Sequence, residues 1–319
     1  MAGIDSFDSG HFCRIDRNSF HISKEMELHE QIFQYIISGL TLGTIYALIA
    51  LGFNIIHNAT GIVNFVQAEF VTLGGMLMYT FYSFCKVPLP LSFLLSTAVV
   101  TFIGALIERG PIRMAKSKAI IVLVFITIGI SSTLRGTALL VWGPDNMPVP
   151  SFSGEKVIRI FGAAILPQHL WIFGITIGVV IFLQYFFHRT LTGKAMRAVS
   201  ANRRAASLAG INVNRMILLS FAMSGGLGAV GGMIIAPIST TSYDTGVMLS
   251  LKGFAAAILG GYGNSTGAIV GGLILGVLES LGAGLISSKF KNAFAFLILL
   301  LVLFLKPSGL LGHGEVERV

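Results

Sequence analysis

The segment HRTLTGKAMRAVSANRRAASLAGINVNR, residues 188–215, carries six Lys and Arg residues and no Asp or Glu. Apolar runs at 170–187 and 216–235 flank it, each about as long as a helix needs to be to cross a bilayer core. Lys and Arg in short loops beside membrane spans mark the cytoplasmic side. The segment therefore predicts a cytoplasmic loop between two spans, and it sets the direction of every other span.

The composition of the whole chain agrees with a membrane protein. The chain has 319 residues, of which 54% are hydrophobic and 11% charged, whereas soluble domains contain about 25% charged residues. Because long apolar runs alternate with short loops, the predicted fold class is an all-α polytopic membrane protein. The net charge is +8, and the cations lie in loops beside the spans. We therefore expect them to orient the spans and to contact anionic lipid, and we expect no nucleic-acid partner.

The apolar runs predict eight or nine transmembrane helices. Residues 108–119 hold four cations and one acid, so this loop is also expected to be cytoplasmic. The run at 247–259 is short: if it crosses, the count is nine and the tail is cytoplasmic, and if it only dips in, the count is eight. We prefer nine, although Lys289 and Lys291 would then lie outside. The predicted spans are 33–56, 62–84 (after a break at 57–61), 89–107, 120–142, 170–187, 216–235, 247–259, 268–286 and 290–305.

Three regions lie outside the spans. Residues 1–25 are polar and lack the apolar core of a signal peptide, so they are interpreted as an extension, with a possible true start at Met26. Residues 26–312 form the predicted transmembrane domain, and 313–319 form a polar tail. The alternating pattern at 156–165 predicts a short hairpin or an irregular cap on the outer face.

No motif for catalysis is present in the sequence. Gly193-Lys194 lacks the earlier Gly and the following Ser or Thr of an ATP-binding loop. Cys13 and Cys85 provide neither a disulfide framework nor a metal-ligand spacing. We therefore expect a protein that is not an enzyme and that holds no cofactor or metal.

Within residues 188–215 we expect a short helix along the membrane face. Ser200 or Asn202 can cap its start, and Gly210 suits the C′ position after its end. Apolar contacts are expected from Met196, Val199, Leu208 and Ile211. Three cations are expected to face water or a partner: Arg197, Arg203 and Arg204.

Polar groups inside spans are expensive in lipid, so they face a cavity or a partner. Asn64 and Gln67, three residues apart, are predicted to share a helix face, with Glu69 about 140° away from Asn64 at about 100° per residue. These three residues line the inner part of a pathway, hold the break closed, or form a polar patch at a helix end. Glu279 either lines or gates the pathway, or forms a structural bond to a neighbouring helix.

Other polar or flexible positions also have competing interpretations. Arg135 is expected to reach outward to the interface, and Lys252 to anchor at an interface or pair with an acid. The glycines at 260, 261, 263 and 267 predict a tight turn with close packing; the alternative is a broken helix that binds a zwitterion.

Several stretches resemble one protein family, in order along the chain. Arg204-Ala205-Ala206-x-x-x-Gly210 resembles the Glu-Ala-Ala…Gly motif through which ABC importer permeases contact their ATPase subunits, with Arg204 in the place of Glu. Residues 39–70, 127–145, 251–280 and the sequence KPSGLLG at 306–312 resemble the permease branch that imports branched-chain amino acids. The likeness extends from Met26 to Gly312.

The resemblance implies a permease subunit in the bacterial inner membrane that translocates leucine, isoleucine and valine by alternating access. Its implied partners are a second related permease chain, two cytoplasmic ATPase subunits and an extracytoplasmic substrate-binding protein. The implied ATPase-coupling residues are Arg197, Arg203, Arg204, Ala205, Ala206 and Gly210. The pathway candidates are Asn64, Gln67, Glu69 and Glu279. A urea or short-amide importer permease remains an alternative, as does a secondary transporter or channel working alone, which would have no use for a docking helix.

Overall fold

The computed structural model describes residues 17–117, 119–154, 156–160 and 163–312. In this part of the chain, seven helices are long and apolar enough to cross a membrane, which agrees with the predicted class of polytopic helical membrane protein. They are α1 (Arg17–Thr60), α3 (Leu89–Ile107), α4 (Ile120–Trp142), α5 (Pro167–Arg189), α8 (Val213–Ser239), α10 (Ser265–Leu285) and α11 (Lys291–Leu305).

The remaining elements are shorter. Two apolar helices, α2 (Gln67–Tyr79) and α9 (Thr245–Gly260), lie among the long ones, and α6 (Leu191–Ala201) and α7 (Arg203–Leu208) fill the basic loop. The π-helical turns η1 (Thr80–Phe84) and η2 (Glu108–Ile112) extend α2 and α3, and the 3₁₀ turn η3 (Ser288–Phe290) precedes α11. The number of crossings, eight or nine, stays a prediction.

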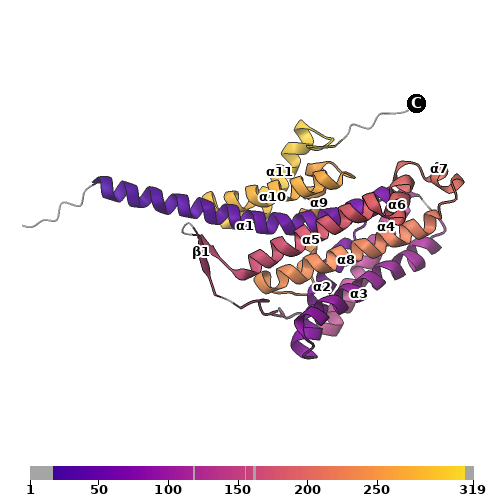
Figure 1. Cartoon of the computed structure of the whole chain (residues 1–319), viewed down its shortest axis with the longest axis horizontal. Coiled ribbons are helices and arrows are strands. Elements are labelled where there is room, and N and C mark those ends of the chain that lie inside the picture. Colours follow the sequence, from indigo (N-terminus) through magenta and orange to yellow (C-terminus); the bar gives the residue numbers. More distant parts are fainter. Residues whose placement is uncertain (1–16, 118, 155, 161–162, 313–319) are drawn as a thin grey trace, which may run out of the picture.

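The predicted hairpin is present. Strands β1 (Ile158–Ile160) and β2 (Ala163–Ile165) pair antiparallel. Figure 1 shows β1 on the side toward which the N-terminal part of α1 extends, and α6 and α7 at the opposite end of the long axis. The sequence prediction that these two segments lie on opposite faces of the membrane agrees with this arrangement.

The two predicted cytoplasmic loops meet at the same end of the molecule, here called the basic end (residues 108–119 and 188–215). Arg113 Nη2 donates a hydrogen bond to the Asn214 carbonyl at 3.2 Å. The chain segment after α11 returns to this end, since the Leu311 amide donates to the Gly260 carbonyl at 3.0 Å and Gly312 lines a cavity together with Arg197. The segment after α11 therefore lies at the basic end.

Glycines allow α1 and α10 to pack with their backbones in contact. A Cβ on Gly39 would lie 2.7 Å from the Val277 Cα, and one on Gly43 would lie 2.8 Å from the Gly272 carbonyl oxygen. Such distances leave no room for a side chain, so the Gly39-x-x-x-Gly43 spacing does serve close helix contact. The core that results is centred on α1, α8, α9 and α10.

The predicted break after the first span is misplaced. α1 continues as a helix to Thr60, and the non-helical segment covers residues 61–66 instead. Two side chains hold the end of α1 against the α9–α10 turn: Asn54 Nδ2 donates to the Asn264 carbonyl at 3.0 Å, and Asn58 Nδ2 to the Gly263 carbonyl at 2.9 Å. These tertiary bonds favour the helical conformation over the break.

The N-terminal helix also differs from expectation. α1 begins at Arg17, inside the stretch that was interpreted as a polar extension, and its membrane-length part begins at His29. Residues 1–16 and the tail at 313–319 lie outside the described residues.

Candidate functional site

The basic loop between α5 and α8 folds into two helices, where the sequence predicted one. Thr190 caps α6 by accepting a hydrogen bond from the Gly193 amide at 3.0 Å, and Asn202 caps α7 by accepting from the Ala205 amide at 3.0 Å. Asn202 has an extended backbone, with φ −159° and ψ 109°, which separates the two helices. Of the two predicted caps Asn202 is therefore correct, whereas Ser200 lies inside α6.

Gly210 occupies the C′ position of α7, as predicted. Its φ is +82°, and the Ile211 amide donates to the Ala206 carbonyl while the Gly210 amide donates to the Ser207 carbonyl, both at 3.0 Å. This pair of bonds is the Schellman ending of a helix, which favours glycine at C′. A Cβ on Gly210 would meet nothing within 4 Å, so the requirement is one of backbone conformation alone.

The two helices expose a mixed cationic and apolar surface, the α7 surface, made of Arg203, Arg204, Ala205 and Leu208. Ala206 is buried, and Met196 and Val199 anchor α6 as predicted. The prediction for Leu208 is wrong, because its side chain is 90% exposed instead of making apolar contacts.

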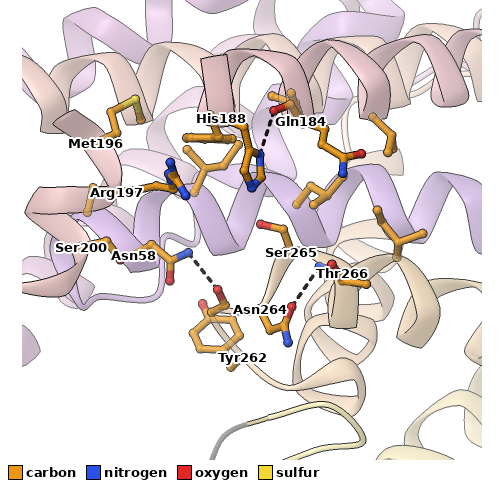
Figure 2. Close-up of a pocket in the computed structure, with 18 of the residues that line it drawn as sticks. Asn58, Gln184, His188, Met196, Arg197, Ser200, Tyr262, Asn264, Ser265 and Thr266 are labelled. Atoms are coloured by element: carbon orange, nitrogen blue, oxygen red, sulfur yellow. Dashed lines mark hydrogen bonds between the residues drawn. The ribbon is translucent and has the colours of Figure 1, made fainter. Parts of the chain in front are cut away.

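Arg197 belongs to a different feature, a cavity of about 710 Å³ between α1, α5, α6 and the start of α10 (Figure 2). Figure 2 shows Arg197 and Ser200 of α6 across this space from Tyr262 and Asn264 in the α9–α10 turn. Burial raises the pKa of the Tyr262 phenol. The cavity leaves α6 incompletely packed against the transmembrane core, so α6 has room to move there.

Glu69 is buried at the first turn of α2 and bonded to α4. Its Oε1 accepts from Arg135 Nη2 at 2.7 Å and from the Ser131 hydroxyl at 2.8 Å. The prediction that Arg135 reaches outward to the interface is therefore wrong. A buried carboxylate close to a guanidinium in a span forms an ion pair, because each charge alone would be expensive in lipid.

Gln67 and Asn64 do not share a helix face as predicted, because α2 begins only at Gln67 and Asn64 lies in the preceding non-helical segment. Gln67 is fully buried and accepts a hydrogen bond from the Ser224 hydroxyl of α8, which also donates to the Gly52 carbonyl at 2.9 Å. Asn64 Oδ1 accepts from the Val66 amide at 3.2 Å. Gln67 thus joins α2 to α1 and α8, and Asn64 shapes the turn that starts α2.

Glu279 lies fully buried in α10 and holds three elements together. It accepts from Lys252 Nζ of α9 at 2.8 Å and from the Tyr46 hydroxyl of α1 at 3.0 Å. Lys291, which the nine-span model places on the outer side, approaches the same carboxylate at 3.9 Å. Of the interpretations left open, the geometry agrees with pairing for Lys252 and with a bond between helices for Glu279.

The glycine-rich stretch after α9 is a tight turn, as predicted. Gly261 and Gly263 have φ values of +106° and +92°, and a Cβ on Gly261 would lie 2.6 Å from the Gly312 Cα. A second interruption, residues 61–66, begins beside the basic loop: a Cβ on Gly61 would lie 3.8 Å from Arg203 Nη2 of α7. Its Phe65 amide bonds to the Thr127 hydroxyl of α4 at 3.3 Å.

The partners that complete these polar clusters were missed in the sequence. Ser131, Ser224 and Tyr46 are ordinary residues in apolar helices, and nothing in their local pattern distinguishes them from lipid-facing or core positions. Only Arg135 carried a signal, since a cation seven residues from a helix end needs either water or an acid. The four pathway candidates lie in separate clusters: Glu69 pairs with Arg135, whereas Glu279 pairs with Lys252.

The fold defines the class: a multi-pass helical membrane protein with two short helices, α6 and α7, at its basic end. The model of the family described as "Branched-chain amino acid transport system / permease component" matches residues 35–303. The chain belongs to this family of ABC transporter permeases.

Individual relatives agree with the family match. The chain is 33% identical to the high-affinity branched-chain amino acid transport system permease protein LivH of Salmonella typhimurium, over 90% of this chain and 97% of that one. It is 31% identical to BraD of Pseudomonas aeruginosa over the same shares. Among solved structures, PsaBC from Streptococcus pneumoniae in complex with Fab is similar in fold, with a TM-score of 0.50 and 14% identity over 90% of this chain and 97% of that one.

Proposed function

We propose that this chain is the transmembrane permease subunit of an ATP-driven importer that translocates branched-chain amino acids across the bacterial inner membrane. Family membership and the activity of relatives such as LivH support this substrate class. The observation that carries the proposal is the pair of capped helices α6 and α7, which stand between two membrane-length helices and expose Arg203, Arg204 and Leu208. A transporter that works without a motor has no use for such a surface.

The α7 surface is the proposed contact for two cytoplasmic ATPase subunits, one of which binds this chain. Ala205 and Ala206 form the middle of α7, and Gly210 ends the helix and fixes the direction in which the chain leaves it. Arg204 stands where the general motif has Glu, so the contact on this chain is proposed to be cationic, with acidic residues on the ATPase. Arg197 of α6 faces the cavity, and its contacts there are proposed to change when α6 moves.

Alternating access is the proposed mechanism. α6 follows α5 after a single extended residue, Thr190, which caps α6, and α7 leads into α8. ATP-driven movement of α7 would therefore shift α5 and α8 together, and the cavity between α6, α1 and α10 gives the movement room. Substrate is delivered by an extracytoplasmic binding protein in this scheme, so the path through the permease does not need high affinity.

A second, related permease chain is the proposed partner within the membrane, and α4 is its proposed contact. The exposed face of α4 carries small residues, including Gly129, Ser132, Thr133 and Gly136. A Cβ at Gly129 or Gly136 would meet nothing within 4 Å in this chain. Small residues let a second helix approach closely.

The first test replaces Gly210 by Val in the complete importer. The β-branched side chain is strained at φ +82°, so α7 should lose its ending while membrane insertion stays normal. We expect leucine uptake to fall by at least tenfold while ATP hydrolysis persists, measured together in proteoliposomes.

Gly154 provides a matched control, because it has the same φ of +82° and the same open surroundings but lies in the loop near the hairpin. Gly154→Val should leave uptake intact. Equal uptake by both variants would refute the coupling role. Leucine uptake by the chain alone, without any ATPase, would support the stand-alone transporter instead, and uptake of urea or acetamide but not leucine would support the amide importer.

A further inference from the structure

A second cavity, here called the midplane cavity, lies between α1, the start of α2, α4 and α9. Its volume is about 190 Å³. Ser131, in its wall, is the twelfth of the 23 residues of α4, so the cavity lies halfway along a membrane-length helix. An engineered cavity of about 150 Å³ holds a benzene molecule, and this one therefore has room for one small amino acid.

The wall of the cavity combines a broad apolar surface with a few polar groups. Its apolar part consists of Phe53, Phe65, Ile128, Val247, Leu251 and Phe254. Its polar part consists of Ser131, Ser132, Arg135 and Ser250. Small-molecule sites share this composition, in which apolar groups supply contact area and a few polar groups set the orientation.

Ser250 supplies an independent sign of a ligand. The residue is only 4% exposed, and its hydroxyl has no hydrogen-bond partner among the described residues. Buried hydroxyls in proteins are nearly always bonded, so one that lines a cavity without a partner indicates a group that arrives there.

The Glu69–Arg135 pair presents its cationic half to the cavity. The Arg135 side chain is 34% exposed and lines the wall, whereas Glu69 is 1% exposed and lies behind it. Glu69 compensates the charge, so an arriving carboxylate meets a guanidinium whose burial is already stabilised. An arginine that is one-third exposed at this depth would be expensive against lipid, so this wall faces substrate, water or another chain.

The start of α2 borders the same wall. α2 begins at Gln67, next to the non-helical segment 61–66, and Ala68 of its first turn lines the cavity. The amides of Gln67 and Glu69 already donate to the Asn64 and Val66 carbonyls, and Glu69 itself places a carboxylate in this turn. The attraction for an anion therefore comes from Arg135. Discontinuous helices near the midplane build substrate sites in other transporters.

We propose that the midplane cavity is a transient binding site for one zwitterionic aliphatic amino acid on its way through the permease. The carboxylate binds Arg135, the ammonium lies at the Ser250 hydroxyl and over the phenylalanine rings, and the aliphatic side chain contacts Phe53, Phe254 and Leu251. This site deepens the proposed function and rests on it.

The experiment measures leucine and valine uptake per ATP by the complete importer in proteoliposomes. Ser250→Ala should lower leucine uptake about tenfold through the lost hydrogen bond to a charged ligand. Ser96→Ala is the matched control: Ser96 is fully buried in α3, also lacks a hydrogen-bond partner among the described residues, and lies outside the cavity wall. It should behave like the wild type.

A second pair of variants measures selectivity between leucine and valine. A purely structural role of the cavity wall would not change this selectivity. Leu251→Phe narrows the cavity and should lower the ratio of leucine to valine uptake several-fold. Leu278→Phe adds the same bulk at a similar exposure on α10, 42% against 39%, and should keep the wild-type ratio. If the wild type takes up leucine but each cavity variant behaves like its control in uptake and selectivity, the site is refuted and the proposed function stands. If the wild type takes up only uncharged amides, both are refuted.

Discussion

At the scale of single residues, the buried pair of Lys252 and Glu279 is the most sensitive position in the membrane part of the chain. Both side chains are at least 93% buried and lie 2.8 Å apart. Lys252→Met leaves Glu279 buried without its cation and should cost about 3–5 kcal/mol of stability. The double variant Lys252→Met, Glu279→Gln should recover a large part of that loss, measured by thermal unfolding in detergent.

The control for this pair is Lys291→Met. Lys291 also approaches Glu279, but at 3.9 Å and with 43% of its side chain exposed, so its loss should change stability by at most about 1 kcal/mol. Equal destabilisation by Lys252→Met and Lys291→Met would contradict the assignment of Lys252 as the principal partner.

Two buried tyrosines provide a second comparison. The Tyr46 hydroxyl donates to Glu279 at 3.0 Å, whereas the Tyr262 hydroxyl is buried with no partner among the described residues. Tyr46→Phe removes a hydrogen bond to a charged group and should lower stability by about 1.5–3 kcal/mol. Tyr262→Phe removes only an unpaired hydroxyl and should leave the melting temperature unchanged or raise it. The reverse order would show that the Glu279 cluster has been misassigned.

At the scale of elements, the division of the basic loop into α6 and α7 depends on Asn202. Its side chain caps α7, a helix of only six residues that has little stability of its own. Asn202→Ala should remove about 1 kcal/mol of cap energy, which is enough to unfold so short a helix and reduce ATP-coupled uptake.

Asn212 is the matched control, because it caps α8 in the same way by accepting from the Arg215 amide at 3.1 Å. α8 has 27 residues and a buried face, so Asn212→Ala should leave the helix and its transport function unchanged. A loss of uptake with Asn212→Ala but not with Asn202→Ala would mean that α8, and not α7, carries the coupling.

At the scale of the whole molecule, α4 and α5 both expose small residues, and only one of them is proposed to meet the second permease chain. Arg135 lies beside the small-residue face of α4 and is partly exposed, which argues that this face is covered by protein or water. The double variant Gly129→Leu, Gly136→Leu should therefore reduce copurification of the second chain severalfold. The equally open Gly174→Leu, Gly178→Leu pair on α5 should retain it.

Much of this architecture was predictable from local patterns. Apolar runs, basic loops and the Asn202 and Gly210 caps are signals within a few residues of sequence, and the structure agrees with them. The wrong predictions concern Arg135, Leu208, the break after the first span and the shared face of Asn64 and Gln67. Each depends on a neighbour from another helix or on a partner outside the chain, and no local pattern reveals such a neighbour.

The sequence alone determined that this chain crosses a membrane many times, which end is basic and where α7 ends. These properties follow from burial of apolar side chains in lipid and from backbone preferences, both of which act residue by residue. Only the tertiary structure decided that Arg135 pairs with Glu69, that Glu279 joins three helices and that the interrupted start of α2 opens on a cavity. In lipid a charge must find its partner wherever the helices bring one within about 3 Å, and the packing of the bundle sets those distances.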